Sequence, residues 1–348
     1  MLEIKDLSVH AGDFSLKDLS FIVESGDYFI LLGKSGAGKS ILLETIAGLI
    51  RPASGSVKLN GVEISGQKIQ NRGIGLVFQD YAIFPHLTVR ENIAYSLHGT
   101  PYSTEEKKEM ILAIAEKVGI SGLLGRKPST LSGGELQRAA LARTLIQKPA
   151  VLLLDEPLSS LDAQLRTDLR SLLRSLNRSG QTIIHVSHDY EEAISLGNRI
   201  AVIHNGMILQ CGSPAEVFHH PRSEFVAHFT GAKNFFRAVI VQEGDAYYGV
   251  VNKTVRIRLG IVPGKEGFLL IRSEDILLSN SRSETSATNN FEGHVREIIP
   301  SRHGAEVLVD IGIPLYAMIT QDSLVNLDIS EGKKILVSFK ASAVRFID

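Results

Sequence analysis

The sequence predicts an α/β domain over residues 1–230, followed by a smaller, all-β, barrel-like domain over residues 234–348. Three observations predict this fold class. Apolar strand patterns alternate with helix patterns through the first domain. A glycine-rich phosphate-loop motif stands between one such strand and one such helix. After Asn234, short strands and glycine turns dominate, and few helices are expected.

The first domain is predicted to contain a mainly parallel sheet, because several of its strands are apolar throughout. Strands are predicted at residues 2–9, 16–23, 28–32, 56–59, 73–79, 150–154, 182–187 and 199–204. Helices are predicted at residues 41–49, 88–98, 103–118, 135–147 and 163–178. Asn60-Gly61 and Asn205-Gly206 favour tight turns. Ser213 to Glu216 forms a capping box with proline at the first helical position.

The second domain contains a faint internal repeat, in which residues 234–239 align with 290–295 and residues 271–276 align with 339–344. Two similar β units indicate a small barrel built by duplication.

Composition limits the functional classes. A net charge of −1 over 348 residues argues against a basic nucleic-acid-binding surface, so no nucleic-acid partner is expected. Cys211 is the one cysteine, which excludes an internal disulfide and favours a reducing compartment. The N-terminus has no signal pattern, and no apolar run approaches the ~18 residues of a membrane span. We therefore expect a soluble protein whose membrane role comes through a partner.

The central motif is GKSGAGKS at residues 33–40, which fits GxxxxGK[ST] at every fixed position. Its glycines let backbone N–H groups approach a phosphate at a helix N-terminus. Lys39 would reach the β- and γ-phosphates, and the Ser40 hydroxyl would bind Mg²⁺. The predicted nucleotide-binding residues are Gly33, Lys34, Ser35, Gly36, Ala37, Gly38, Lys39, Ser40 and Ile41.

Two further motifs support this chemistry. The stretch LSGGE at residues 131–135 predicts a second phosphate-binding loop at a helix start. The alternative interpretation is a flexible loop that only caps the helix. The stretch VLLLDE at residues 151–156 ends a buried strand in two carboxylates. Asp155 would bind Mg²⁺, since a buried carboxylate is costly without a cation. Glu156 is expected to activate the attacking water as a general base.

Together these motifs resemble those of ATPase subunits of ABC transporters, over residues 1 to about 230. The resemblance implies that Gln79 is the Q-loop glutamine, that residues 159–162 are the D-loop and that His188 is the switch histidine. The implied catalytic residues are Lys39, Glu156 and His188. The implied Mg²⁺ residues are Ser40, Gln79 and Asp155. Phe14 or His10 would stack on adenine. His185 is predicted to be a packed residue of a strand.

The resemblance also implies partners. Two copies would form a homodimer that clamps ATP between the phosphate loop of one subunit and the signature of the other. The implied signature residues are Ser132, Gly133, Gly134 and Glu135. A permease helix would dock around Gln79 and residues 81–87, which puts the protein at the cytoplasmic face of the membrane. An extracytoplasmic substrate-binding protein would be an indirect partner.

The β domain resembles the OB/TOBE-like regulatory domains of importer ATPases, and its last unit is similar to the oxyanion-binding modules of molybdate systems. Hydroxyls, backbone N–H groups and cations suit a tetrahedral dianion. The implied oxyanion residues are Ser286, Arg302, Lys340, Ala341 and Ser342. The expected function is ATP-driven import of molybdate or tungstate, with feedback inhibition by the bound oxyanion.

Three alternatives remain open. The cargo could instead be sulfate, a sugar or a polyamine, with a purely structural β domain. A non-transport ATPase acting on DNA or the ribosome is disfavoured, because no coiled coil, second ATPase domain or basic surface is visible. A binding module with an inactive ATPase is disfavoured by the presence of Lys39, Asp155, Glu156 and His188.

Overall fold

The computed structural model describes residues 1–159, 161–261, 264–282, 285–301 and 304–347. The chain divides into two compact units, Met1–Val217 and Phe218–Asp348. Residues 218–230, which the sequence analysis included in the first domain, group with the second unit. The reason is that α8 (Glu224–Phe229) packs on the start of the following strand, where the His228 and Phe235 rings lie 5.3 Å apart.

The first unit contains a six-stranded sheet in the order β10-β9-β3-β8-β7-β6. Its strands are parallel except for β10, which pairs antiparallel with β9. In chain order they are β3 (Tyr28–Leu32), β6 (Ile74–Val77), β7 (Val151–Asp155), β8 (Thr182–Ser187), β9 (Arg199–His204) and β10 (Met207–Gly212). A parallel sheet of this kind collects the carboxyl ends of β3, β7 and β8 at one edge.

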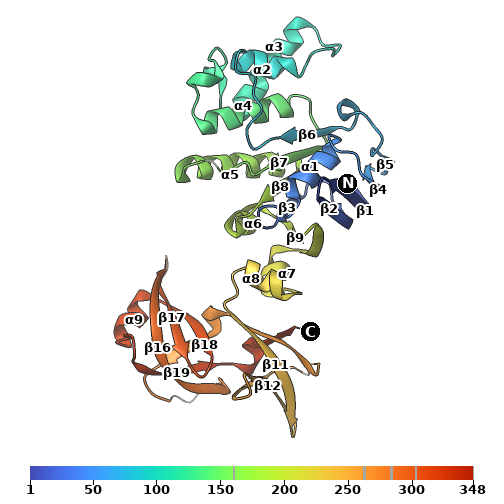
Figure 1. Cartoon of the computed structure of the whole chain (residues 1–348). Helices are drawn as coiled ribbons and strands as arrows, with labels where there is room; N and C mark the ends of the chain where they lie inside the picture. The colour runs from blue at the N-terminus through green and yellow to red at the C-terminus, as the bar shows by residue number, and fades with distance from the viewer. Residues whose placement is uncertain (160, 262–263, 283–284, 302–303, 348) are drawn as a thin grey trace. The chain divides into compact units, whose positions relative to one another are not determined.

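A second, antiparallel sheet has the order β2-β1-β4-β5. Its strands are β1 (Leu2–Ala11), β2 (Phe14–Val23), β4 (Ser54–Leu59) and β5 (Val62–Glu63). The main hydrophobic core of this unit joins the two sheets and α1 (Lys39–Ala47), and all five residues of β3 are buried. The strand that leads into the phosphate loop is therefore fixed on both sides (Figure 1).

The remaining helices of the first unit begin at polar caps, as the sequence indicates. They are α2 (Val89–Tyr95), α3 (Thr104–Lys117), α4 (Gly133–Leu145), α5 (Ala163–Arg178), α6 (Tyr190–Leu196) and α7 (Pro214–His219), the last of which runs into the second unit. Short 3₁₀ turns lie at η1 (Ile69–Asn71), η2 (Ser121–Leu123) and η3 (Pro128–Thr130). Helices α2, α3 and α4 each start with a complete capping box, at Thr88, Ser103 and Ser132.

The second unit consists mainly of two five-stranded antiparallel sheets, in the orders β13-β12-β11-β14-β20 and β15-β19-β16-β17-β18. The first five strands are β11 (Asn234–Glu243), β12 (Ala246–Val251), β13 (Val255–Leu259), β14 (Glu266–Ile271) and β15 (Leu277–Ser279). The last five are β16 (Asn289–Ser301), β17 (Gly304–Asp310), β18 (Pro314–Ile319), β19 (Lys334–Phe339) and β20 (Arg345–Ile347). One core joins both sheets. Helices α8 and α9 (Gln321–Asn326) make the unit less purely β than expected.

The two β units correspond as predicted at residues 271–276 and 339–344, where each holds a 3₁₀ turn (Ser273–Asp275 and Ala341–Ala343), but the predicted alignment of residues 234–239 with 290–295 is wrong by one residue. Asn234 exchanges two hydrogen bonds with the Tyr316 backbone of β18, at 2.8 and 2.7 Å. Asn289, not Asn290, makes the reciprocal pair with the Arg258 backbone of β13, at 3.1 and 2.7 Å. Each repeat also gives its last strand to the other sheet, since β15 pairs with β19 and β20 pairs with β14.

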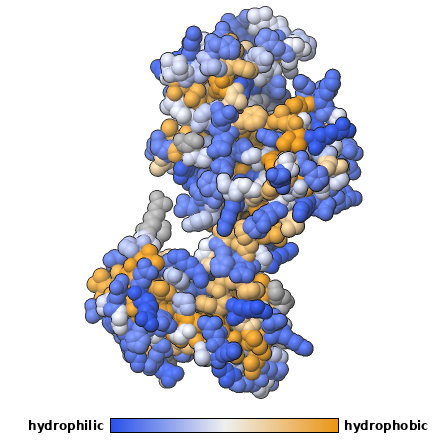
Figure 2. Space-filling view, in the orientation of Figure 1, coloured by the Kyte–Doolittle hydropathy of each residue, from blue (hydrophilic) through white to orange (hydrophobic). Residues whose placement is uncertain are grey.

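Polar residues cover most of the visible surface of each unit, with smaller hydrophobic patches between them (Figure 2). Among the described residues, no helix is both long enough and apolar enough to cross a membrane.

Candidate functional site

The phosphate loop joins β3 to α1 in a conformation that requires glycine. Gly38 precedes α1 with a left-handed φ of 99°, which a side chain would strain. A Cβ at Gly33 would lie 2.6 Å from the Ile203 carbonyl oxygen of β9. An α-helix leaves its first N–H groups without intrahelical acceptors, so this loop and helix start can bind phosphate oxygens.

Lys39 is buried at the centre of this loop, with 5% of its surface exposed. Its ammonium donates to the carbonyl oxygens of Gly33 at 2.9 Å and Lys34 at 3.1 Å. Burial lowers the pKa of Lys39, and the carboxylates of Glu156 and Asp155 oppose that shift. The ammonium is therefore held in place before any phosphate arrives.

Asp155 ends β7 beside the loop. Burial raises the pKa of its carboxyl, while a hydrogen bond from the Ser40 hydroxyl lowers it. Its Oδ1 atom is buried without a hydrogen-bond partner, which is costly for a carboxylate unless a cation is bound. Ser40 and Gln79 line the adjoining pocket. This set of oxygen atoms fits Mg²⁺, a hard cation that prefers oxygen ligands.

Glu156 connects the three predicted catalytic residues. One carboxylate oxygen lies 3.8 Å from Lys39 Nζ, and the other lies 3.3 Å from His188 Nδ1. Its backbone is left-handed, with a φ of 44°, which is strained for a non-glycine residue and typical of functional sites. The Glu156 side chain lines the pocket over the phosphate loop.

A pocket of about 470 Å³ lies over the loop. Its lining residues are Phe14, Ser35, Gly36, Gly38, Lys39, Ser40, Ile41, Gln79 and Glu156. The Phe14 ring packs close to the loop, since a Cβ at Gly38 would lie 2.6 Å from Phe14 Cε1. His10 is exposed on β1 and bonds to Ser15 at 2.9 Å. The geometry therefore favours Phe14 over His10 as the residue that stacks on adenine.

The signature residues lie outside this pocket. Ser132 caps α4, and both its N–H and its hydroxyl donate to Glu135 Oε2, at 2.8 and 3.0 Å. Among the described residues that line the phosphate-loop pocket, none comes from residues 132–135. In the predicted D-loop, Ser160 lies outside the described residues, and Asp162 caps α5 by accepting from the Leu165 N–H at 2.9 Å.

Arg143 is a functional candidate that the sequence analysis missed. From the last turn of α4, it donates to the carbonyl oxygens of Tyr81 at 3.2 Å and Ala82 at 2.7 Å. Both of these loop residues have left-handed backbones, with φ values of 64° and 46°. The guanidinium also lies 5.4 Å from the Phe84 ring centre. Arg143 therefore ties the signature helix to the loop that follows Gln79.

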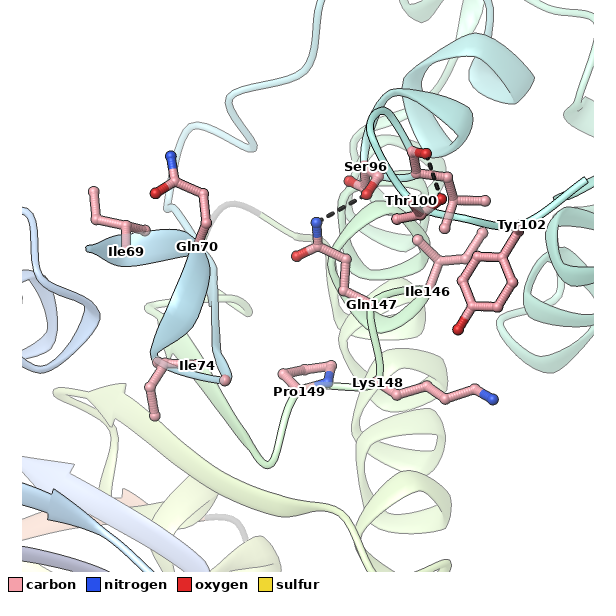
Figure 3. A pocket seen from close by; sticks show the side chains of 12 residues that line it. Ile69, Gln70, Ile74, Ser96, Thr100, Tyr102, Ile146, Gln147, Lys148 and Pro149 are labelled. Carbon is pink, nitrogen blue, oxygen red and sulfur yellow. Dashed lines mark hydrogen bonds between the residues drawn. The ribbon is translucent and has the colours of Figure 1, made fainter. Parts of the chain in front are cut away.

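An apolar groove adjoins this loop. A pocket of about 480 Å³ lies between Ile69 and Ile74 on one side and Tyr102, Ile146 and Pro149 on the other (Figure 3). A second pocket of about 220 Å³ shares its Ile69 and Ile74 wall and extends to Phe78 and Arg143. The predicted docking surface, Gln79 with residues 81–87, thus continues into a groove that the sequence did not reveal. The apolar residues Leu49, Ile69 and Tyr102 of its lining are exposed.

Four of the five predicted oxyanion residues, Ser286, Lys340, Ala341 and Ser342, flank one end of the β16–β19 pair. These strands pair antiparallel with Asn289 opposite Phe339. Ser286 shortly precedes β16 and Lys340 directly follows β19, so this register brings the two segments side by side. Ser286, Lys340 and Ser342 are exposed. Arg302 lies outside the described residues.

Two family models and several curated proteins match this chain. A family model described as ABC transporter matches residues 16–159, and one described as TOBE domain matches residues 285–346. The molybdate/tungstate import ATP-binding protein WtpC of Pyrococcus abyssi is 42% identical over 350 residues, which cover 99% of each chain. The sulfate/thiosulfate import ATP-binding protein CysA of Mycolicibacterium paratuberculosis is 39% identical over 97% of this chain and 88% of that protein.

A solved structure is also similar. It is the dimeric structure of a post-hydrolysis state of the ATP-binding cassette MJ0796 bound to ADP and Pi. It is 28% identical with a TM-score of 0.56, and the match covers 62% of this chain and 99% of that chain.

Proposed function

Because the chain belongs to the ATP-binding subunits of ABC importers, which hydrolyse ATP, we propose that the cargo of its transporter is molybdate or tungstate. The similarity to a molybdate/tungstate import protein extends over 99% of the chain, including the β domain, and this observation carries the proposal. The adjacency of the Ser286 and Lys340 segments supports an oxyanion site in that domain.

In the proposed mechanism, Glu156 accepts a proton from the attacking water, for which a carboxylate within reach of the γ-phosphate is suited. Lys39 binds the β- and γ-phosphates, and His188, which now contacts Glu156, contacts the γ-phosphate. Lys39 and His188 thereby stabilise the charge that develops on the phosphate in the transition state. Phe14 stacks on adenine.

Ser40, Gln79 and Asp155 would hold Mg²⁺, consistent with the unpartnered Oδ1 of Asp155. When bound, the ion would neutralise charge on the phosphate oxygens. The Ser40 hydroxyl, which donates to Asp155 in this structure, would offer its oxygen to the ion.

The proposed assembly is a homodimer bound to a membrane permease at the cytoplasmic face, supplied by an extracytoplasmic substrate-binding protein. The separation of Ser132 from the phosphate-loop pocket supports an ATP site shared between two subunits, and the similar cassette MJ0796 is described as dimeric. A helix of the permease would occupy the groove between Ile69 and Tyr102. Its movement would reach the signature through Arg143.

Oxyanion bound to the second unit would inhibit transport when the cell is replete. Such coupling between two sites is typically worth ~1–3 kcal/mol. In the reconstituted transporter, molybdate on the cytoplasmic side should lower the rate of ATP hydrolysis about tenfold. An unchanged rate at saturating molybdate would refute the feedback proposal and leave the cargo proposal standing.

The cargo proposal is tested by calorimetry of the full chain with molybdate, tungstate, sulfate and phosphate. We expect binding of molybdate or tungstate alone, and its loss in Lys340→Ala and Ser342→Ala. Lys334→Ala is the matched control, because this lysine lies at the opposite end of β19 from Lys340 and pairs with Glu292. If no anion binds, the site in the second unit is refuted.

Sulfate import is the second candidate, since the CysA relative is 39% identical over nearly the whole chain. Preferential binding of sulfate in the same experiment would favour it.

A further inference from the structure

A chain of buried polar contacts lies behind His188, and the mechanism above does not use it. The Tyr28 hydroxyl of β3 lies 3.0 Å from His185 Nδ1 in β8. His185 Nε2 faces Glu192 Oε2 of α6 at 3.5 Å, an electrostatic contact that is too poorly aligned to count as a hydrogen bond. The same carboxylate oxygen accepts from the Ser187 hydroxyl at 2.6 Å. We name these four residues the switch relay: Tyr28, His185, Ser187 and Glu192.

The switch relay is almost free of solvent, with 1%, 0%, 3% and 5% of the respective residues exposed. Burial raises the pKa of Glu192, but contacts with His185, Ser187 and Arg170 outweigh it and leave the pKa below its usual value. Glu192 is therefore an ionised acceptor. The His185 ring thus lies between the Tyr28 hydroxyl on its Nδ1 side and the Glu192 carboxylate on its Nε2 side.

The relay ends at the backbone on either side of His188. Ser187 precedes His188, and its hydroxyl accepts from the Asp189 N–H at 3.0 Å. Asp189 in turn caps α6, because its carboxylate accepts from the Glu191 N–H at 2.7 Å. His188 itself is 59% exposed, so packing contributes little to its position. Its placement depends on the backbone that the Ser187 hydroxyl fixes.

The other end of the relay lies on the strand of the phosphate loop. Tyr28 begins β3, which pairs with β8 along its whole length and leads directly into Gly33. Lys39 and His188 thus project from two segments that the same buried network joins. Arg170 of α5 also approaches this network, at 3.9 Å from Asp189 and 4.0 Å from Glu192.

We propose that the switch relay is a positioning device that holds the His188 backbone at a fixed distance from the phosphate loop. This inference rests on the proposed role of His188 in ATP hydrolysis. Misplacement of a reacting group by ~1 Å can reduce a rate ~10²-fold. A purely structural network would instead affect folding stability without acting through His188.

The test compares Ser187→Ala, which removes the hydroxyl, with Ser187→Thr, which keeps it. Ser195→Ala is the matched control, because this serine also bonds to Glu192 but only to its carbonyl oxygen, at 3.2 Å, and does not touch the switch loop. We expect S187A to lower the kcat of ATP hydrolysis by about tenfold or more, with KM for ATP within about twofold. S187T should restore activity, and S195A should match the native protein.

The decisive measurement repeats S187A in a His188→Ala background. If the relay acts through His188, its loss should cost nothing further there. An equal loss of rate in both backgrounds, or no recovery in S187T, overturns the proposal. Tyr28→Phe removes one hydroxyl at the far end of the relay and serves if S187A does not fold. It should give a smaller loss of kcat that also disappears in the H188A background.

The same series separates the two hypotheses. If H188A hydrolyses ATP at the native rate, the proposed role of His188 fails. If H188A is impaired but S187A and Y28F are not, only the relay fails.

Discussion

The phosphate loop and the signature loop perform related tasks, but they are built differently. In the phosphate loop, Lys39 is buried and held by two backbone carbonyls, and a pocket of about 470 Å³ opens over it. In the signature loop, Ser132 is exposed, and its hydroxyl donates to Glu135. The phosphate loop presents its binding groups within one chain. The Ser132 hydroxyl of the signature loop, in contrast, is already used in the cap of its own helix.

This difference indicates which loop contributes the free energy of ATP binding and which contributes that of subunit closure. ATP meets a preformed cationic loop, so a single chain should bind it. In the proposed homodimer, the signature would exchange its Ser132–Glu135 contact for contact with phosphate, so its contribution should appear only when two subunits close. The capping box of α3 provides an internal reference outside the site. The Ser103 N–H donates to Glu106 at 2.7 Å and the Glu106 N–H donates to the Ser103 hydroxyl at 3.3 Å, and the same two bonds in α4 measure 2.8 and 3.4 Å.

The largest effect is expected for Lys39→Ala, which removes the buried ammonium. Hydrogen bonds to charged groups contribute about 1.5–3 kcal/mol, so the affinity of the isolated chain for ATP should fall about 10- to 100-fold. Equilibrium binding of a fluorescent ATP analogue measures this. Lys117→Ala, at the exposed end of α3, is the control and should bind normally. An unchanged affinity for ATP in K39A would show that the phosphate loop is not the main ATP-binding element.

The sequence analysis found the residues that belong to short local motifs and missed those whose contacts are distant in the chain. The ATP site was predictable because Lys39, Asp155 and Glu156 belong to short motifs in which a strand, a turn and a helix fix the backbone. Arg143 and Glu192 were not predictable, since their partners lie elsewhere in the chain and leave no local pattern. A charged residue in a helix gives the same sequence pattern whether its side chain is buried or solvated.

The repeat in the second unit shows a different limit. Asn289 and Asn290 are adjacent and identical, so the pattern alone could not decide which one corresponds to Asn234. Only Asn289 is buried, and its amide bridges to β13. A one-residue shift in a strand moves every side chain to the other face. The true alignment pairs Phe236 with Phe291, which both pack against the shared core.

A smaller effect is expected for Ser132→Ala. Loss of an N-cap costs about 1 kcal/mol of stability, and Ser103→Ala should cost about the same. Only S132A should also lower ATP hydrolysis, by about tenfold, because a hydrogen bond to the phosphate is lost. Binding of ATP to the single chain should be unchanged. Thermal melts and phosphate release on both variants test this, and equal activity in S132A and S103A would argue against a signature role.

The smallest and sharpest test is Glu135→Gln. Gln keeps an oxygen that accepts from the Ser132 N–H and hydroxyl, so the capping box is retained. What changes is the charge, since hydrogen bonds from Ser132 hold the pKa of Glu135 below its usual value and keep it ionised. A carboxylate beside the hydroxyl that must bind phosphate opposes closure. Its neutralisation should therefore lower the KM for ATP hydrolysis about threefold.

Glu106→Gln is the matched control, because it makes the same change in the capping box of α3. If both substitutions shift the melting temperature equally but only E135Q lowers KM, then the signature carboxylate restrains closure of the ATP site. The effect should weaken in high salt, because the repulsion acts between partly exposed charges. A KM that rises in E135Q would instead mean that the carboxylate orients Ser132 for phosphate, and the two loops would then be alike in being preorganised.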